Sequence, residues 1–206
     1  VCCPGSISRT VPQVPGYMYA HSGDDLYVTL YAATETEAAL TSGKVKVKQK
    51  TEYPFEGKIV LTIDPAKDGQ EFNLRLRIPT WAPDKRFLPG KLYTFKEAPP
   101  PWTLTVNGQV VAPRMEKGFA VVERSWKAGD KVQLDLPMPV QFSTAYNRAV
   151  AYNGRVAVTR GPFVFCAEEI DNGMQVQRLA VPQLPKPDQV KVTSIKDGLL
   201  EGMPMI

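Results

Sequence analysis

The chain has 206 residues, 43% of them hydrophobic, and a formal net charge of +4 from 25 basic and 21 acidic side chains. That length is enough for one large β domain or two small ones. The charge is too mild to indicate a nucleic-acid partner, no apolar run approaches the roughly 20 residues of a membrane helix, and three cysteines are too few for a disulfide framework. We therefore expect no nucleic acid and no membrane among its partners.

Two adjacent cysteines, Cys2 and Cys3, open the chain. Neighbouring cysteines close only a small, strained ring when they oxidise to each other, so they are poorly suited to a structural disulfide. Adjacent thiolates suit either a shared soft metal such as zinc or a division of roles between a nucleophile and a metal ligand. Because the chain lacks an initiator Met and begins within this motif, we expect a piece of a longer protein that starts just before a catalytic cysteine.

The alternation typical of strands begins only after residue 23. Residues 6–11 are predicted to form a short helical piece, which Pro12 and then Pro15 are expected to end. From residue 24 onward hydrophobic and polar side chains alternate with period two, which is typical of half-buried strands. The predicted strands cover residues 26–31, 58–63, 72–78, 102–106, 109–111, 118–123, 131–136, 155–159 and 163–167.

Two of these segments allow more detailed predictions. Within residues 72–78, Leu74 is expected to face the core and Arg75 is expected to face outward. The pair Asn107 and Gly108 separates two predicted strands. It fits a two-residue hairpin turn, in which both residues need a positive φ.

Residues 44–50 form a lysine stripe, because four lysines alternate there with Val45, Val47 and Gln49. On a strand the lysines would share one face and the other three side chains the opposite face. Two explanations remain open from the sequence: a solvated sheet face, or an edge strand that its lysines protect from pairing with another chain.

Short strands separated by frequent turns predict an all-β fold, an antiparallel β-sandwich of jelly-roll-like character. Residues 24–170 contain no convincing helical period. Residues 83–101 hold five prolines and predict a long inserted loop.

The predicted organisation has three parts. Residues 1–23 carry the cysteine pair, residues 24–172 form the sandwich, and residues 173–206 are a Pro-rich extension or the start of a further β element. One or two short strands, such as residues 189–193, are expected in the extension. The last residues, 203–206, indicate either another cut in the chain or an element that returns to the main sheet.

The remaining residues with reactive or ring side chains favour structural roles. Cys166 lies in an apolar run and is expected to be a small buried hydrophobe. His21 lacks the partners of a catalytic triad and would at most edge a substrate cleft. The tryptophans favour core packing near strand ends over a sugar-stacking platform; they are Trp81, Trp102 and Trp126. The sequence contains no phosphate loop, dinucleotide fingerprint or calcium-loop spacing.

Several motifs together carry a resemblance that covers most of residues 1–172. They are residues 2–10, 15–19, 26–31, 76–81, 106–108, 126–130, 134–139 and 155–162. In order and spacing they resemble the β-L-arabinofuranosidase family of glycoside hydrolases, family 127, which has a close sister family, 146.

The resemblance implies an (α/α)6 catalytic barrel followed by β-sandwich domains, so residues 1–23 would be the last segment of a barrel that lies upstream. It also implies a zinc ion held by one Glu and three Cys. Cys2 would be both the nucleophile and a zinc ligand, and Cys3 would be a zinc ligand alone. The other two ligands and the acid/base Glu would lie upstream, since Glu168 and Glu169 do not sit in the matching motif.

The function that the resemblance implies is retaining hydrolysis of L-arabinofuranosides or related plant glycans by the full-length protein. This chain alone would be inactive and would hold zinc weakly or not at all. Its partners would be the upstream barrel of the same chain and an oligosaccharide substrate, in the periplasm or cytoplasm of a glycan-degrading bacterium. Residues 83–101 form a longer insertion than the family has at that point. The alternative is a stand-alone carbohydrate-binding β-sandwich module without catalysis.

Overall fold

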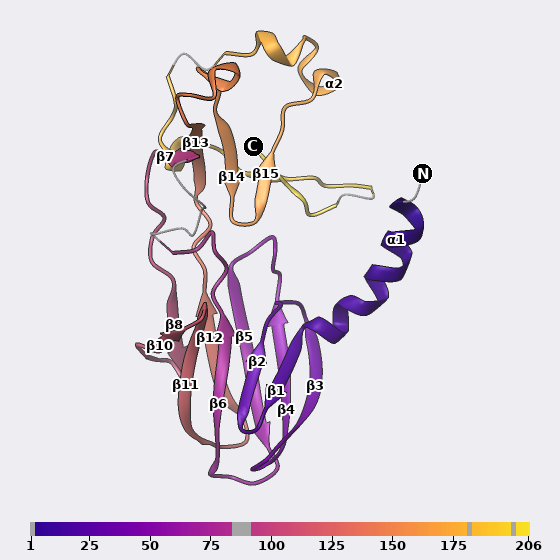
Figure 1. The fold of residues 1–206 in the computed structure, drawn as a ribbon, viewed down its shortest axis with the longest axis vertical. Helices are drawn as coiled ribbons and strands as arrows, with labels where there is room; N and C mark the ends of the chain where they lie inside the picture. The colour runs from indigo at the N-terminus through magenta and orange to yellow at the C-terminus, as the bar shows by residue number, and fades with distance from the viewer. Residues whose placement is uncertain (1–2, 84–91, 181–182, 199–200) are drawn as a thin grey trace. The chain divides into compact units, whose positions relative to one another are not determined.

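The computed structural model describes residues 3–83, 92–180, 183–198 and 201–206 (Figure 1). The chain divides into two units, one of residues 1–79 with 102–136 and one of residues 80–101 with 137–206. These divisions fall inside the segment 24–172 that was expected to form one sandwich. The predicted boundaries after residues 23 and 172 stay a prediction.

The first unit contains two β-sheets that face each other (Figure 1). The first sheet consists, in spatial order, of β1 (Tyr19–Ser22), β2 (Asp25–Val28), β6 (Gln70–Arg77), β11 (Phe119–Trp126) and β10 (Arg114–Glu116). The second consists of β3 (Thr34–Leu40), β4 (Gly43–Thr51), β5 (Lys58–Pro65), β12 (Asp130–Asp135), β8 (Thr103–Val106) and β9 (Gln109–Val110). The neighbours β2 and β6 are parallel, whereas the other strand pairs described in these sheets are antiparallel. The predicted all-β sandwich is confirmed.

The core of this unit lies between the two sheets and follows from the alternation of the strands. Leu26 and Leu74 of the first sheet and Leu61 of the second have no exposed surface. Each strand points alternate side chains inward, so the hydrophobic residues of both sheets meet in one layer. Burial of this apolar surface is the main favourable term in the stability of the unit.

The lysine stripe lies on β4, whose neighbours in the sheet are β3 and β5. Its lysines are exposed, while Val45, Val47 and Gln49 are buried on the opposite face. Lys44 forms an ion pair with Glu37 at 2.7 Å, and Lys48 forms one with Glu35, both across to β3. The solvated-face explanation is therefore confirmed, and edge protection is wrong because β4 is not an edge strand.

Arg75 departs in one respect from the sequence prediction. It lies on the outer face of the first sheet, as predicted, but only 8% of its surface is exposed. Its guanidinium contacts Asp25 at 3.0 Å and Glu116 at 3.1 Å, and it lies over the ring of Tyr27. Burial raises the pKa of Asp25, but hydrogen bonds from Arg75 and Asn73 outweigh it and hold that pKa below its usual value.

The turn at Asn107 and Gly108 is confirmed, with φ of 52° and 79°. Asn107 also joins this hairpin to the turn before β12. Its Nδ2 donates to Asp130 Oδ1 at 2.8 Å, and its Oδ1 accepts from the backbone N–H of Lys131 at 2.8 Å. The second oxygen of Asp130 accepts from the backbone N–H of Lys127 at 2.9 Å.

Asp130 therefore makes stability dependent on pH. Burial raises the pKa of Asp130, but the hydrogen bonds from Asn107 and Lys127 outweigh it, so that the pKa lies below its ordinary value of 3.8. A lowered pKa stabilises the fold at neutral pH and loses that contribution as pH falls through the folded-state value. We expect Asp130→Asn to cost about 1.5–3 kcal/mol at neutral pH and to flatten the acid limb of stability.

Urea unfolding at neutral and acid pH measures both effects, with the exposed Asp197→Asn as the control. An acid limb as steep in Asp130→Asn as in the wild type would contradict the assignment.

The second unit contains a smaller sheet in the order β15 (Phe163–Phe165), β14 (Ala157–Arg160), β13 (Val140–Ala145) and β7 (Tyr93–Phe95). Short helical turns also belong to this unit, namely η2 (Val150–Tyr152), α2 (Glu169–Asn172), η3 (Val176–Arg178) and η4 (Pro187–Gln189). The long loop predicted at 83–101 is wrong in part, because β7 pairs with β13 there. Residues 84–91 of that loop lie outside the described residues.

The C-terminal extension forms a separate pair of strands, β16 (Thr193–Ser194) with β17 (Pro204–Met205). The last residues therefore do not return to a main sheet. The strand predicted at 189–193 begins later than expected, because residues 187–189 form η4 with Pro187 in its first turn. None of the helices in the described ranges is long and apolar enough to cross a membrane.

Candidate active-site segment

The cysteine pair leads into α1 (Cys3–Thr10), which continues as the 3-10 helix η1 (Val11–Tyr17). The predicted helical piece is confirmed and begins earlier than residue 6. Pro4 lies in the first turn, where its missing N–H has no intrahelical partner to lose. The α-helix ends at Thr10, two residues before Pro12, and Pro12 and Pro15 lie within the 3-10 helix that follows.

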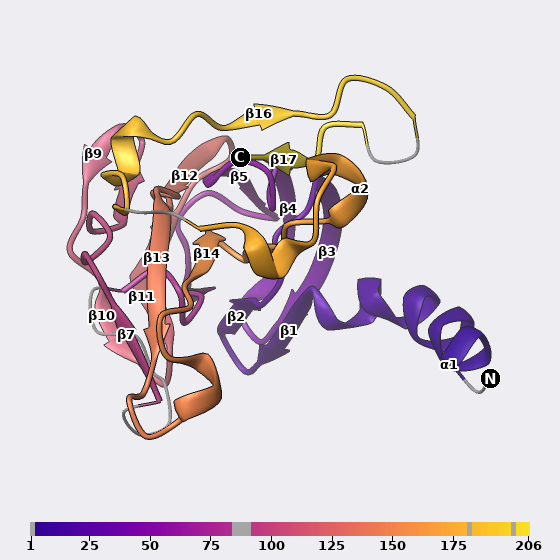
Figure 2. The same cartoon turned by 90° about the horizontal axis from the view of Figure 1, so that it is seen from above.

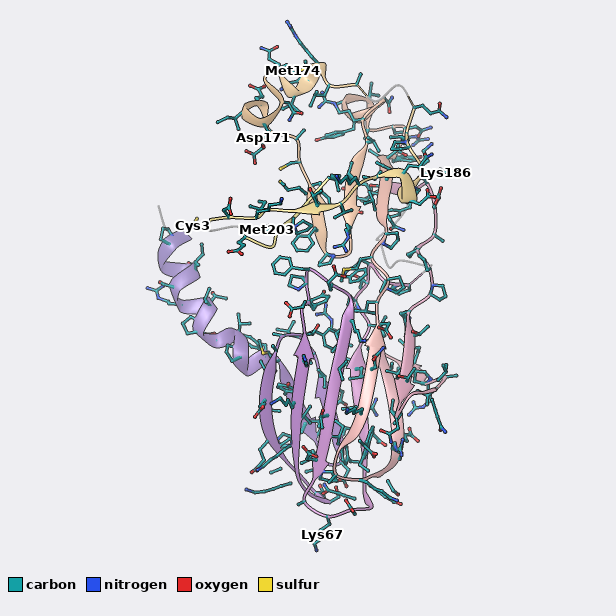
Figure 3. The ribbon with its side chains drawn as sticks, turned by 180° about the vertical axis from the view of Figure 1, so that it is seen from behind. Cys3, Lys67, Asp171, Met174, Lys186 and Met203 are labelled. Atoms are coloured by element: carbon teal, nitrogen blue, oxygen red, sulfur yellow. The ribbon has the colours of Figure 1, made fainter. Side chains whose placement is uncertain are left out.

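Cys3 is the first residue of α1 and carries a free, exposed thiol (Figure 3). Cys2, the predicted nucleophile and second zinc ligand, lies outside the described residues. Among the residues that the structure does describe, no three His, Cys, Asp or Glu side chains come close enough to hold a metal. An accessible thiol is a ligand type that suits zinc. The exposure of Cys3 is compatible with its predicted role as a zinc ligand, which stays a prediction.

The helical segment makes little contact with the rest of its unit. The described residues of α1 and η1 include no buried side chain, and the segment projects from the start of β1 away from the two sheets (Figures 1 and 2). It is held where it meets the sandwich. The backbone N–H of Thr29 donates to Met18 O at 2.9 Å, and the Thr29 hydroxyl donates to Tyr17 O. Thr29 is available because β2 ends at Val28, earlier than predicted.

Cys166 is not the buried hydrophobe that its apolar run predicted, because the structure leaves it exposed. It comes directly after β15, which forms an edge of the smaller sheet and ends at Phe165. A short strand at the edge of a sheet has few neighbours to pack against the residue that follows it. The apolar segment is therefore not buried at Cys166.

The tryptophans divide between core and partial burial. Trp126 has no exposed surface, which confirms the core role for that residue. Trp81 and Trp102 are half-buried. His21 lies on β1 with its side chain exposed, and its place at a substrate cleft stays a prediction.

Sequence reasoning missed a polar group at the junction between the helical segment and the sandwich. Tyr19, the first residue of β1, receives a hydrogen bond from Gln49 on β4 at 2.6 Å. The sequence pattern that could have indicated this group is the alternation along β4, which places Gln49 on the same face as Val45 and Val47.

Two family models match the chain in sequence order. The GH127 middle domain of β-L-arabinofuranosidase matches residues 25–138, and the glycoside hydrolase family 127 C-terminal domain matches residues 140–196. The chain belongs to glycoside hydrolase family 127. The predicted family is thereby confirmed, and the junction of the two family domains lies beside the division of the two units at residues 136 and 137.

Relatives in family 127 are longer than this chain. A non-reducing end β-L-arabinofuranosidase of Bifidobacterium longum is 31% identical over 175 residues, which are 83% of this chain and 24% of the relative. A solved GH127 β-arabinofuranosidase is 39% identical with a TM-score of 0.74, and the match covers 82% of this chain and 26% of that one. A GH127 β-L-arabinofuranosidase from Geobacillus stearothermophilus is 35% identical with a TM-score of 0.72, covering 84% and 25%. The chain thus spans about a quarter of the length of these relatives.

Proposed function

We propose that this chain is the middle and C-terminal part of a β-L-arabinofuranosidase that acts on L-arabinofuranosides or related plant glycans. The observation that carries the proposal is the match of both GH127 domains, in order, over residues 25–196. The relatives named for this activity are 31–39% identical to the chain.

The cysteine pair would supply the nucleophile for retaining hydrolysis. In the first step the Cys2 sulfur attacks the anomeric carbon and the bond to the leaving oxygen breaks, while an upstream carboxylic acid gives that oxygen its proton. In the second step the same carboxylate takes a proton from water, the water oxygen attacks the anomeric carbon, and the carbon–sulfur bond breaks. The product sugar keeps its anomeric configuration.

Zinc is the metal that this donor set would suit, with Cys2 and Cys3 joined by an upstream Glu and a third upstream Cys. When bound, it would keep thiolates ionised at neutral pH. Two ligands on one short segment are too few for a stable zinc site, because structural zinc sites use four. We therefore expect this chain alone to hold zinc weakly or not at all and to be inactive without the upstream barrel.

The test is hydrolysis of a chromogenic β-L-arabinofuranoside by the full-length protein, with the α-anomer and this chain alone as comparisons. We expect release of the chromophore from the β-anomer only, and only by the full-length protein, which should also contain zinc by elemental analysis. Failure of the zinc-loaded protein to hydrolyse the β-anomer would overturn the proposed substrate.

A further inference from the structure

Gln49 is the polar exception on the inner face of β4. It is 2% exposed, and it continues a row in which Val45 and Val47 are 0% and 1% exposed. Burial of an amide costs free energy unless all its polar atoms find partners, and Gln49 Oε1 has no hydrogen-bond partner among the described residues. Gln70 Oε1 and Gln141 Oε1 are buried without a partner too, so the hydrogen-bond partners of Gln49, and not its unpaired oxygen, distinguish it.

The Gln49 amide donates into a chain of hydrogen bonds. Gln49 Nε2 donates to the Tyr19 hydroxyl at 2.6 Å. The Tyr19 hydroxyl and Thr34 Oγ1 share a hydrogen bond of 2.8 Å in which either can donate, and the Thr34 hydroxyl donates to Ala32 O at 3.2 Å. Gln49 Nε2 also lies 3.3 Å from Leu30 O and 3.5 Å from Thr34 Oγ1. Gln49 and Thr34 belong to the second sheet and Tyr19 to the first, so the chain of bonds crosses the sandwich.

Tyr19 is the residue at which the helical segment meets the sandwich. It comes two residues after the end of η1, pairs with Val28 in the first sheet, and lies beside the backbone contacts of Met18 with Thr29. Within this chain the described part of α1 and η1 buries no side chain, and its recorded hydrogen bonds to the sandwich lie at this junction.

We infer that Gln49 and Tyr19 are positioning residues for the cysteine-bearing segment: their hydrogen bond fixes where η1 leaves the sandwich and so contributes to the placement of Cys3. This inference rests on the proposed function. Small displacements matter in such a role, since a shift of about 1 Å at a reacting group can cost roughly 10²-fold in rate.

The first test replaces Gln49 by Leu in the full-length protein, which keeps the size of the side chain and removes the amide. The matched control is Gln70→Leu. Gln70 is also buried, and its Nε2 donates to Gly43 O at 3.0 Å, at the opposite end of β4 from Gln49. We expect Gln49→Leu to lower kcat by about 10–100-fold with KM nearly unchanged, and Gln70→Leu to leave kcat near the wild-type value.

The second test separates positioning from loss of stability and from the choice of substrate. Amide hydrogen exchange of the full-length variants, read at Tyr17–Tyr19 and Thr29–Leu30, should be faster in Gln49→Leu than in the wild type or in Gln70→Leu, at an unchanged midpoint of thermal unfolding. Unchanged exchange at this junction would overturn the inference, and so would faster exchange with an unchanged kcat. If the wild type proves inactive on arabinofuranosides, the proposed function fails while the exchange rates still decide the role of Gln49.

A third variant shows whether the two residues act as one unit. Tyr19→Phe removes only the hydroxyl, and it should reproduce the kcat loss of Gln49→Leu. Residues in one hydrogen-bonded network are not additive, so the double variant should lose no more than either single variant. Additive losses would contradict the shared role.

Discussion

Replacing Cys2 by serine in the full-length protein is expected to lower kcat on a β-L-arabinofuranoside by roughly 10³-fold or more. A serine hydroxyl stays protonated at neutral pH and is a far weaker nucleophile than a thiolate. It is also a poorer ligand for a soft metal. Steady-state kinetics with the chromogenic substrate measure the loss, and intact mass after a slow substrate would show a sugar adduct on the wild type that the variant lacks.

The chain offers matched controls for this experiment. Cys166→Ser should leave both kcat and zinc content unchanged, because Cys166 is exposed after an edge strand of the second unit. Cys3→Ser should lower the zinc content and kcat together, because Cys3 is proposed as a metal ligand only. Wild-type activity in Cys2→Ser would mean that the cysteine pair is structural, and the proposed mechanism would then be wrong.

The sandwich was predictable because its strands obey a local rule. Alternation places Leu26, Leu61 and Leu74 inward, and the structure buries all three completely. The hairpin at Asn107 was equally predictable, since that turn type demands positive φ at both positions and few residue pairs tolerate it.

Predictions failed where the neighbours of a strand decide the outcome. Arg75 faces outward as predicted, but β2 and β10 bring Asp25 and Glu116 against it, and neither contact is visible in the local pattern. The prediction for Cys166 was wrong: its segment is apolar, yet the residue follows an edge strand and is exposed. In both cases alternation predicts the face of a sheet but not the groups that cover that face.

The candidate site was predictable only through resemblance to a family. An adjacent cysteine pair alone leaves metal binding and nucleophilic catalysis both open, and only the resemblance suggests that the groups completing the site lie upstream. Gln49 is a local sign for the inferred junction, because a buried amide in a row of valines conflicts with the surrounding pattern. Such conflicts between local pattern and fold are where functional constraints are expected.

Trp126→Ala is expected to have a larger effect on stability than the other substitutions proposed for this chain. The Trp126 side chain has no exposed surface, its ring stacks on Phe72 with centroids 5.3 Å apart, and its Nε1 donates to Phe72 O at 2.9 Å. Trp126→Ala would leave a large cavity at the end of β11 and remove that hydrogen bond. We expect a loss of about 3–5 kcal/mol, measured by urea unfolding of this chain followed by far-UV circular dichroism.

Two variants separate the causes of that loss. Trp126→Phe keeps much of the ring volume and removes the Nε1 donor, so its cost should approach that of one hydrogen bond plus a smaller cavity. Trp102→Ala deletes the same side chain at a half-buried position, where less apolar surface is lost, and should cost clearly less than Trp126→Ala. Equal costs at the two positions would contradict the core role of Trp126. A Trp126→Ala variant that stayed folded and lost sugar binding would instead support the sugar-stacking role, which the burial of Trp126 argues against.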